Sequence, residues 1–193
     1  MSATNRGTKR KEADFYATPR DAILSLLENY YIANSYDLIL EPSAGNGIII
    51  ETLREAGIDN YIHAIEIRIE EKERLQKSAS CVEITDFLNI DPSLSYDVII
   101  GNPPFSLAQE FIDKSLSLLN PGGRLIFLLR TNFLESKKRF EWWQDKFPTR
   151  LYVLSKRPSF TGKGTDATSY SWFIWEKTRY ENQFIKQQEI RVI

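Results

Sequence analysis

Short apolar runs alternate with helical segments along most of the chain, and this alternation constrains the fold more than any other feature. The runs Tyr36–Glu41, Tyr61–Ile67 and Tyr96–Ile100 are apolar at successive positions, which is typical of strands buried on both faces. Segments with apolar residues at helical spacing lie between them, for example Leu107–Leu119. Repeated strand–helix units predict an α/β sandwich, in which helices cover both faces of a mostly parallel sheet.

The whole pattern predicts seven strands and five helices, and the last two strands are expected to close the sheet as an antiparallel hairpin. Thr18 is expected to cap the first helix, with Pro19 in its first turn. Asn120–Gly123 is expected to be a turn. The expected helices are the segment after Pro19, Ile48–Ala56, Glu70–Lys77, Leu107–Leu119 and Phe133–Phe147. The expected strands are Tyr36–Glu41, Tyr61–Ile67, Cys81–Ile84, Tyr96–Ile100, Arg124–Leu129, Leu151–Leu154 and Tyr170–Trp175.

A chain of 193 residues suits a single domain with short extensions. We expect a flexible basic arm at 1–14, a globular domain at 15–177 and a tail at 178–193. The chain has one cysteine and one histidine, which excludes an internal disulfide and a Cys/His zinc site, and no metal is expected. No apolar run reaches the roughly 18 residues of a membrane span, and the polar start is no signal peptide. We therefore expect a cytoplasmic protein without a membrane partner.

Charge is distributed unevenly along the chain, although the net charge is only −1. Residues 12–101 contain 6 basic and 17 acidic residues, whereas residues 102–193 contain 15 basic and 9 acidic residues. The first 11 residues add four basic side chains and no acidic one. An acidic middle flanked by basic ends suits a protein whose ends approach a polyanion, although ordinary solvated surface explains the same charges.

Acidic and glycine residues follow the first three expected strands, where a parallel sheet binds ligands. Glu41–Gly47, with the sequence EPSAGNG, contains two glycines that allow a tight turn before a helix. The carboxylate of Glu41 would repel a pyrophosphate and favours a ligand with a cationic group. Glu66 could accept hydrogen bonds from both hydroxyls of a ribose, and Asp86-Phe87 could bind an exocyclic amine and a purine face. A generic strand-to-helix turn, a surface acid and a capped turn explain these three segments one by one, but together they predict a pocket for an adenosine with a cationic amino-acid arm.

The most specific motif is Asn102-Pro103-Pro104-Phe105, which follows the fourth expected strand. The prolines stiffen the backbone and remove two N–H donors, so that nearby carbonyls can accept hydrogen bonds. The side-chain oxygen of Asn102 and the Pro103 carbonyl could then hold both protons of a planar NH2 group, while Phe105 stacks on its ring. A Pro-Pro turn that only ends a strand is the plain alternative.

These motifs and their order resemble those of class I, S-adenosylmethionine-dependent amino methyltransferases, over about residues 15–176. The nearest resemblance is to N6-adenine nucleic-acid methyltransferases with the gamma order of motifs, and Asn in the first catalytic position favours adenine N6 over cytosine N4. The resemblance implies a Rossmann-like methyltransferase domain and S-adenosyl-L-methionine as cofactor. The catalytic residues that it implies are Asn102, Pro103, Pro104 and Phe105. The cofactor-binding residues that it implies are Tyr16, Thr18, Glu41, Pro42, Ser43, Gly45, Gly47, Glu66, Asp86 and Phe87.

A basic loop at 156–164 is the expected contact with the substrate. An adenine inside a duplex hides its amino group, so the base must be flipped out or unpaired. Phe160 could stack on the second face of such a base, while Arg157 and Lys163 hold flanking phosphates. A solvated hairpin loop with Phe160 packed inward explains the same residues.

We predict adenine N6 methylation of nucleic acid, with DNA favoured over RNA. The gamma enzymes usually carry a separate recognition domain, and little chain is left for one here, so structured RNA stays open as a substrate. A glutamine side-chain amide of a protein is a second alternative, because it is also a planar NH2 group. A binding subunit without turnover is a third. The adjacent Trp142 and Trp143 cannot both be buried on one helix face, so one of them could mark a surface for a protein partner or a second copy.

Overall fold

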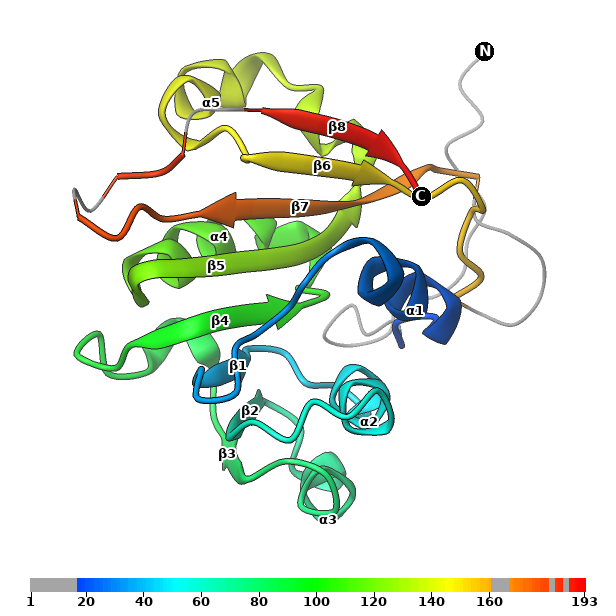
Figure 1. The fold of residues 1–193 in the computed structure, drawn as a ribbon, viewed down its shortest axis with the longest axis vertical. Coiled ribbons are helices and arrows are strands. Elements are labelled where there is room, and N and C mark those ends of the chain that lie inside the picture. Colours follow the sequence, from blue (N-terminus) through cyan, green and yellow to red (C-terminus); the bar gives the residue numbers. More distant parts are fainter. Residues whose placement is uncertain (1–16, 161–166, 181–182, 186–187) are drawn as a thin grey trace.

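The structure of the chain is a computed structural model that describes residues 17–160, 167–180, 183–185 and 188–193. Within these ranges the chain forms one eight-stranded sheet with helices on both faces (Figure 1). The arm predicted at 1–14 lies outside the described residues. None of the helices in these ranges has the length and apolar character that crossing a bilayer requires.

The sheet has the strand order β3-β2-β1-β4-β5-β7-β6-β8. The five strands from β3 to β5 run parallel, β7 is antiparallel to both β5 and β6, and β8 is parallel to β6. The prediction of a mostly parallel sheet closed by an antiparallel hairpin is therefore confirmed. The strands are β1 (Ile39–Glu41), β2 (Ile62–Glu66), β3 (Cys81–Ile84), β4 (Tyr96–Gly101), β5 (Leu119–Arg130), β6 (Arg150–Val153), β7 (Tyr170–Glu176) and β8 (Glu189–Val192).

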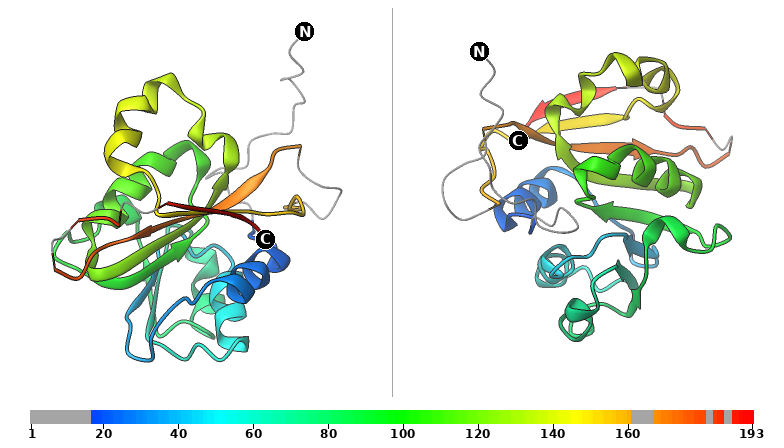
Figure 2. Two further views of the ribbon diagram at one scale, coloured as in Figure 1. Left: turned by 45° about the horizontal axis from the view of Figure 1, so that its top comes forward. Right: turned by 180° about the vertical axis from the view of Figure 1, so that it is seen from behind.

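Two apolar layers sandwich the sheet. Helices α1, α2 and α3 cover one face, and α4 and α5 cover the other (Figure 2). Successive residues of β5 point into opposite layers: Ile126 and Leu128 pack with the first group of helices, and Phe127 and Leu129 with the second. This two-sided burial explains why the strands are apolar at consecutive positions. The helices are α1 (Arg20–Asn29), α2 (Ile48–Glu55), α3 (Lys72–Leu75), α4 (Ala108–Ser117) and α5 (Phe140–Lys146).

The expected tail contributes an eighth strand, which the sequence analysis does not predict. β8 pairs through its backbone with β6, but Ile190 and Val192 leave 68% and 71% of their surface exposed. Its sequence alternates apolar Ile190 and Val192 with charged Glu189 and Arg191, which is the period of a strand, so this short signal in the expected tail could have identified it. Asn120–Gly123 also differs from expectation: it is the irregular start of β5, held to β4 by a 2.9 Å hydrogen bond from Asn120 Nδ2 to Asp97 Oδ1.

The helix expected at Phe133–Phe147 is shorter, because only α5 is α-helical. Two 3-10 turns precede it, and the backbone is extended at Ser136 between them. The Arg139 guanidinium donates to the Phe133 carbonyl at 2.8 Å and stacks on the Phe133 ring, so these side chains favour the two turns over a continuous helix. Contacts of this kind between nearby side chains do not change the spacing of apolar residues, so the sequence pattern does not reveal them.

Two smaller expectations also need correction. The side chain of Thr18 does not cap α1: Pro19 occupies the N-cap position without a side-chain bond, and Thr18 is buried. Trp143 is buried, and Trp142 is partly exposed: its ring packs on that of Phe133, and its Nε1 donates to Asp113 Oδ1 at 2.9 Å. The tryptophan pair therefore contributes to packing, and its geometry gives no argument for a partner surface.

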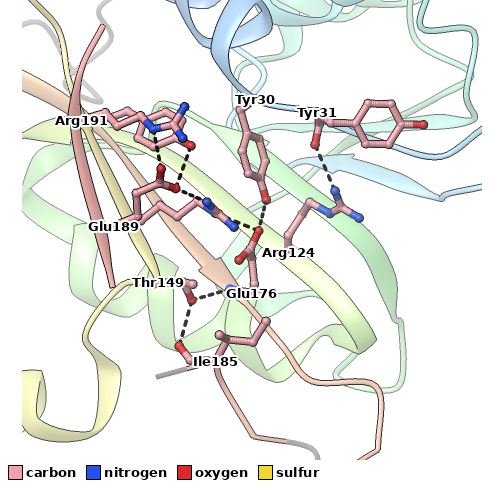
Figure 3. Close-up of polar contacts among 10 residues, drawn as sticks. Tyr30, Tyr31, Arg124, Thr149, Glu176, Ile185, Glu189 and Arg191 are labelled. Carbon is pink, nitrogen blue, oxygen red and sulfur yellow. Dashed lines mark hydrogen bonds and ion pairs between the residues drawn. The ribbon is translucent and has the colours of Figure 1, made fainter. Parts of the chain in front are cut away.

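A polar network joins α1 to the C-terminal half of the sheet (Figure 3). Glu176 Oε1 accepts from the Tyr30 hydroxyl at 2.7 Å and from Arg150 Nε at 3.2 Å. Arg150 also pairs with Glu189, so the network connects α1, β6, β7 and β8. Burial, and then the adjacent Glu176 carboxylate, raise the pKa of Tyr30, which keeps its hydroxyl protonated as a donor.

Glu176→Ala should lower the free energy of unfolding by about 2 kcal/mol, because it leaves a half-buried hydroxyl and guanidinium without their shared acceptor. Lys156→Ala is the control, since it breaks an ion pair with Asp21 in which both side chains are mostly exposed, and it should give no measurable change. Urea unfolding followed by circular dichroism measures both. Equal effects of the two substitutions would contradict a stabilising role for the network.

Candidate active site

The carboxyl ends of β1, β2, β3 and β4 open onto one cavity of about 450 Å³. The strand order reverses between β1 and β4, which is where ligands bind in open parallel sheets. The volume lies in the range of small-molecule sites. The cavity brings together most of the residues singled out from the sequence: Thr18, Glu41, Pro42, Ser43, Gly45, Glu66, Asp86, Phe87, Asn102, Pro103, Pro104 and Phe105. Tyr16 and Lys163 lie outside the described residues.

The loop after β1 turns sharply before α2. Gly45 and Gly47 have φ angles of 56° and 79°, in the left-handed region that favours glycine. Gly47 forms the N-cap of α2 and does not line the cavity; a Cβ at this position would approach Leu75 Cδ2 to 3.1 Å. Its place is therefore structural, since it lets α2 begin directly behind the loop and pack on α3.

Glu66 at the end of β2 is buried and holds this loop in place. Its Oε2 accepts from the backbone N–H of Gly45 at 2.7 Å. Its Oε1 accepts from both the backbone N–H and the Nε of Arg68, at 3.0 and 2.9 Å. The carboxylate lines the cavity, as expected of a ribose acceptor, but it also cross-links the β1 and β2 loops.

Glu41 is the second buried carboxylate of the cavity, and it is only 2% exposed. Its Oε2 has no hydrogen-bond partner among the described residues. Burial, and then the nearby Glu66 carboxylate, raise the pKa of Glu41 well above the ordinary carboxyl value. A buried acid without a donor is unfavourable in the protein alone, and a cationic group in the cavity would offset this cost.

Asp86 and Phe87 line the cavity after β3, but both also have local partners. Asp86 Oδ1 caps a 3-10 turn by accepting from the Leu88 N–H at 3.0 Å, and Oδ2 accepts from Asn89 Nδ2 at 3.3 Å. The Phe87 ring is 2% exposed and packs on Phe111 of α4, with ring centroids 4.9 Å apart. Little of the Phe87 ring is therefore available to the face of a purine.

The Asn102–Phe105 stretch follows β4 directly and touches the β1 loop. The Ser43 hydroxyl donates to the Asn102 carbonyl at 3.4 Å, and the Leu107 N–H donates to the Pro104 carbonyl at 2.9 Å. These two bonds fix the peptides on either side of the Pro103 carbonyl. A Cβ on Gly101 would lie 3.3 Å from Pro42 Cδ, so the small residue allows the two loops to approach each other.

Phe105 joins the cavity to an aromatic cluster outside it. Its ring centroid lies 5.8 Å from that of Tyr170 and 6.5 Å from that of Phe160. The guanidinium of Arg130, at the end of β5, lies 4.8 Å from the centre of the same ring. Phe160 does not line the cavity, and it packs toward Tyr170 with centroids 4.8 Å apart. Arg157 is exposed and also lies outside the cavity lining.

Sequence reasoning misses two basic residues of this region. Arg68 lines the cavity and binds Glu66, and its place two residues after that acid is a signal that could have identified it. Arg130 ends β5 beside Phe105. Its place directly after the fifth expected strand, Arg124–Leu129, is a signal that could have identified it.

No protein-family profile matches the sequence. The chain is 26% identical to the type II methyltransferase M.TthHB8I of Thermus thermophilus, in a match that covers 50% of this chain and 30% of that enzyme. This chain thus matches less than a third of the length of that curated relative.

Solved structures show the same fold at low sequence identity. A candidate class I S-adenosylmethionine-dependent methyltransferase from Listeria monocytogenes aligns with a TM-score of 0.66 and 15% identity, over 97% of this chain and 68% of that one. The M protein of the type I restriction enzyme EcoKI gives 0.66 and 14%, over 92% and 48%. A candidate RNA methyltransferase from Pyrococcus horikoshii gives 0.63 and 14%, over 91% and 95%. This chain therefore has the Rossmann-like fold of the class I methyltransferases.

Proposed function

We propose that this chain is an S-adenosylmethionine-dependent methyltransferase that modifies adenine N6 in nucleic acid, with DNA as the favoured substrate. The observation that carries the proposal is the shared cavity of the Asn102–Phe105 stretch and the buried acids Glu41 and Glu66. One strand end supplies acceptors for a planar amine, and the neighbouring strand ends supply acids for a cationic nucleoside.

The residues present fit S-adenosylmethionine. Its ammonium and sulfonium groups are cationic, and Glu41 offers a buried carboxylate oxygen without a donor among the described residues. Glu66 and Asp86 line the cavity and can accept further hydrogen bonds from ribose and adenine, because each carboxylate oxygen has two lone pairs. When bound, the cofactor supplies an electrophilic methyl group.

The chain's own residues act on the acceptor amine, the group that receives the methyl. The Asn102 side-chain oxygen and the Pro103 carbonyl accept its two N–H protons and stabilise the positive charge that develops on nitrogen as the bond forms. Pro103 and Pro104 hold these oxygens in place, and Phe105 orients the ring that carries the amine. The nitrogen becomes acidic only after alkylation, so no strong base is needed beforehand.

Nucleic acid is favoured as the acceptor by charge and by similarity. Residues 102–193 hold 15 basic against 9 acidic residues, and this half contains the aromatic cluster around Phe105. The relative in sequence is named as a type II methyltransferase, and the EcoKI M protein shares the fold. RNA is the second candidate, because a candidate RNA methyltransferase also shares the fold. The protein-amide alternative has no corresponding observation in its favour.

The substrate is identified by incubating the chain with labelled S-adenosylmethionine and, separately, unmethylated DNA, ribosomal RNA and a protein extract. We expect N6-methyladenine in the DNA, detected by nucleoside mass spectrometry. Single-stranded DNA should react faster than duplex, because an unpaired base needs no flipping. Label found only in RNA would show that the substrate is RNA and not DNA. Label found only on glutamine would refute a nucleic-acid substrate.

Asn102→Ala should lower kcat by about 10²–10³-fold, because it removes one of the two acceptors that stabilise the charged amine. The dissociation constant for S-adenosylmethionine, measured by calorimetry, should stay within about threefold, since the cofactor acids are intact. Asn29→Ala, which changes an exposed asparagine of α1, is the matched control and should keep full activity. Wild-type turnover by the Asn102 variant would refute the assigned role.

Glu41→Gln should weaken S-adenosylmethionine binding by about 10–100-fold, the worth of one hydrogen bond to a charged group. The raised pKa of Glu41 keeps this side chain protonated at pH values well above the ordinary carboxyl pKa of about 4.3. A cationic ligand needs Glu41 to be ionised. In the wild type, the affinity for S-adenosylmethionine should therefore still rise with pH in that range. Binding should therefore release a proton, which calorimetry in buffers of different ionisation enthalpy detects.

The Glu41→Gln variant should lose this pH dependence and the proton release. Glu55→Gln, at an exposed ion pair with Arg20, is the matched control and should keep both. Binding that is unaffected by pH in the wild type would rule out Glu41 as the partner of the cationic group.

A further inference from the structure

A cation–aromatic contact outside the cavity holds the ring that the proposed function assigns to the acceptor base. The Arg130 guanidinium lies 4.8 Å from the centre of the Phe105 ring. Phe105 lines the cavity and Arg130 does not, so the guanidinium contacts the ring from outside that space. A contact of this kind is favourable because the face of the ring carries negative charge density.

The sheet fixes the position of Arg130. It is the last residue of β5 and lies directly opposite Tyr170, the first residue of β7, in the antiparallel register. The Tyr170 hydroxyl accepts from Arg130 Nε at 3.2 Å, and Tyr170 itself is only 1% exposed. A buried hydroxyl on a neighbouring strand therefore orients the guanidinium plane against Phe105.

Phe105 needs such an external support because its own segment is short. The ring belongs to a three-residue 3-10 turn, Phe105–Leu107, that follows directly on the two prolines. Its other ring contacts are Tyr170 and Phe160, at centroid distances of 5.8 and 6.5 Å. Arg130 adds a planar group that stays charged at every relevant pH, so its hold on the ring does not titrate.

We propose that Arg130 is a positioning residue for methyl transfer: it fixes the Phe105 ring, and through this ring the plane of the acceptor base. The inference rests on the proposed function. It assigns Arg130 to the orientation of the base and not to the binding of a phosphate. The two roles predict different responses to salt, because each phosphate contact adds about 0.9 to the slope of log affinity against log salt.

The first test compares Arg130→Met with Arg124→Met, a matched change in the middle of β5, where the guanidinium binds the Tyr31 carbonyl. Arg130→Met should lower kcat on an adenine-containing oligonucleotide about tenfold, the upper part of the range for a cation–aromatic contact. Cofactor affinity and the salt dependence of oligonucleotide binding should stay at wild-type values. Arg124→Met should leave all three quantities unchanged.

Two further variants separate positioning from general destabilisation. Tyr170→Phe removes the acceptor of Arg130 but keeps the ring, and it should lower kcat by a smaller factor, about threefold. In a protein that already carries Phe105→Leu, adding Arg130→Met should lower kcat by less than about twofold, because the ring through which Arg130 acts is gone. Additive effects in this cycle, or a salt slope lower by about 0.9 in Arg130→Met, would overturn the proposal.

A crystal structure of the Arg130→Met protein tests the contact independently of substrate. We expect the Phe105 ring to be displaced or to adopt two orientations, while the Glu41–Gly47 loop keeps its conformation. An unmoved ring together with unchanged kcat would refute the proposal. If the wild-type chain methylates no nucleic acid, the proposed function fails instead, and the crystal structure still decides whether Arg130 sets the ring.

Discussion

The candidate site depends on two carboxylates, Glu41 and Glu66, that are buried side by side at the ends of β1 and β2. Removing a carboxylate from water costs several kcal/mol unless hydrogen bonds or opposite charge replace the water. Glu66 receives three such bonds, from Gly45 and from the backbone and side chain of Arg68. Glu41 Oε2 receives none from the described residues. The compensated acid therefore belongs to the fold, while the uncompensated one points to a ligand.

The position of the Asn102–Phe105 stretch depends on the loop that Glu66 holds. Because Glu66 holds the Gly45 turn, the β1 loop can pack against the end of β4, where Pro42 meets Gly101 and Ser43 binds the Asn102 carbonyl. Under the proposed function, this contact between the two loops would set the spacing between the cofactor and the acceptor amine. On the far side, β5 and β7 supply Arg130 and Tyr170, which contact Phe105, so the Asn102–Phe105 stretch lies between the β1 loop and these two strands.

The sequence predicts the sheet and the site neighbourhood because both follow from short-range signals. Consecutive apolar residues reveal strands covered on both faces, and polar residues after each strand reveal where ligands bind. The prediction is incomplete where one side chain has two partners: Asp86 is expected to bind an adenine amine, with a capped turn as the plain alternative, and the structure shows the cap. It also misses β8, because Ile190 and Val192 alternate with charged residues over only four positions. Arg130 directly follows the fifth expected strand, but its contact with Phe105 depends on the order of strands, which no local pattern contains.

The fold separates the acidic and the basic stretches of the chain in space. Within the described residues, the acidic stretch, from residue 17 to 101, builds β1 to β4, and the basic stretch, from residue 102 on, builds β5 to β8. Since β3, β2, β1 and β4 are neighbours in the sheet, and β5, β7, β6 and β8 are neighbours beside them, the two charge classes occupy opposite halves. The cavity opens on the acidic half, and Phe105 lies next to the basic one. Under the proposed function, the acidic half would attract the cationic cofactor and the basic half would attract the polyanionic nucleic acid. Each reactant would therefore be drawn to its own side of the site.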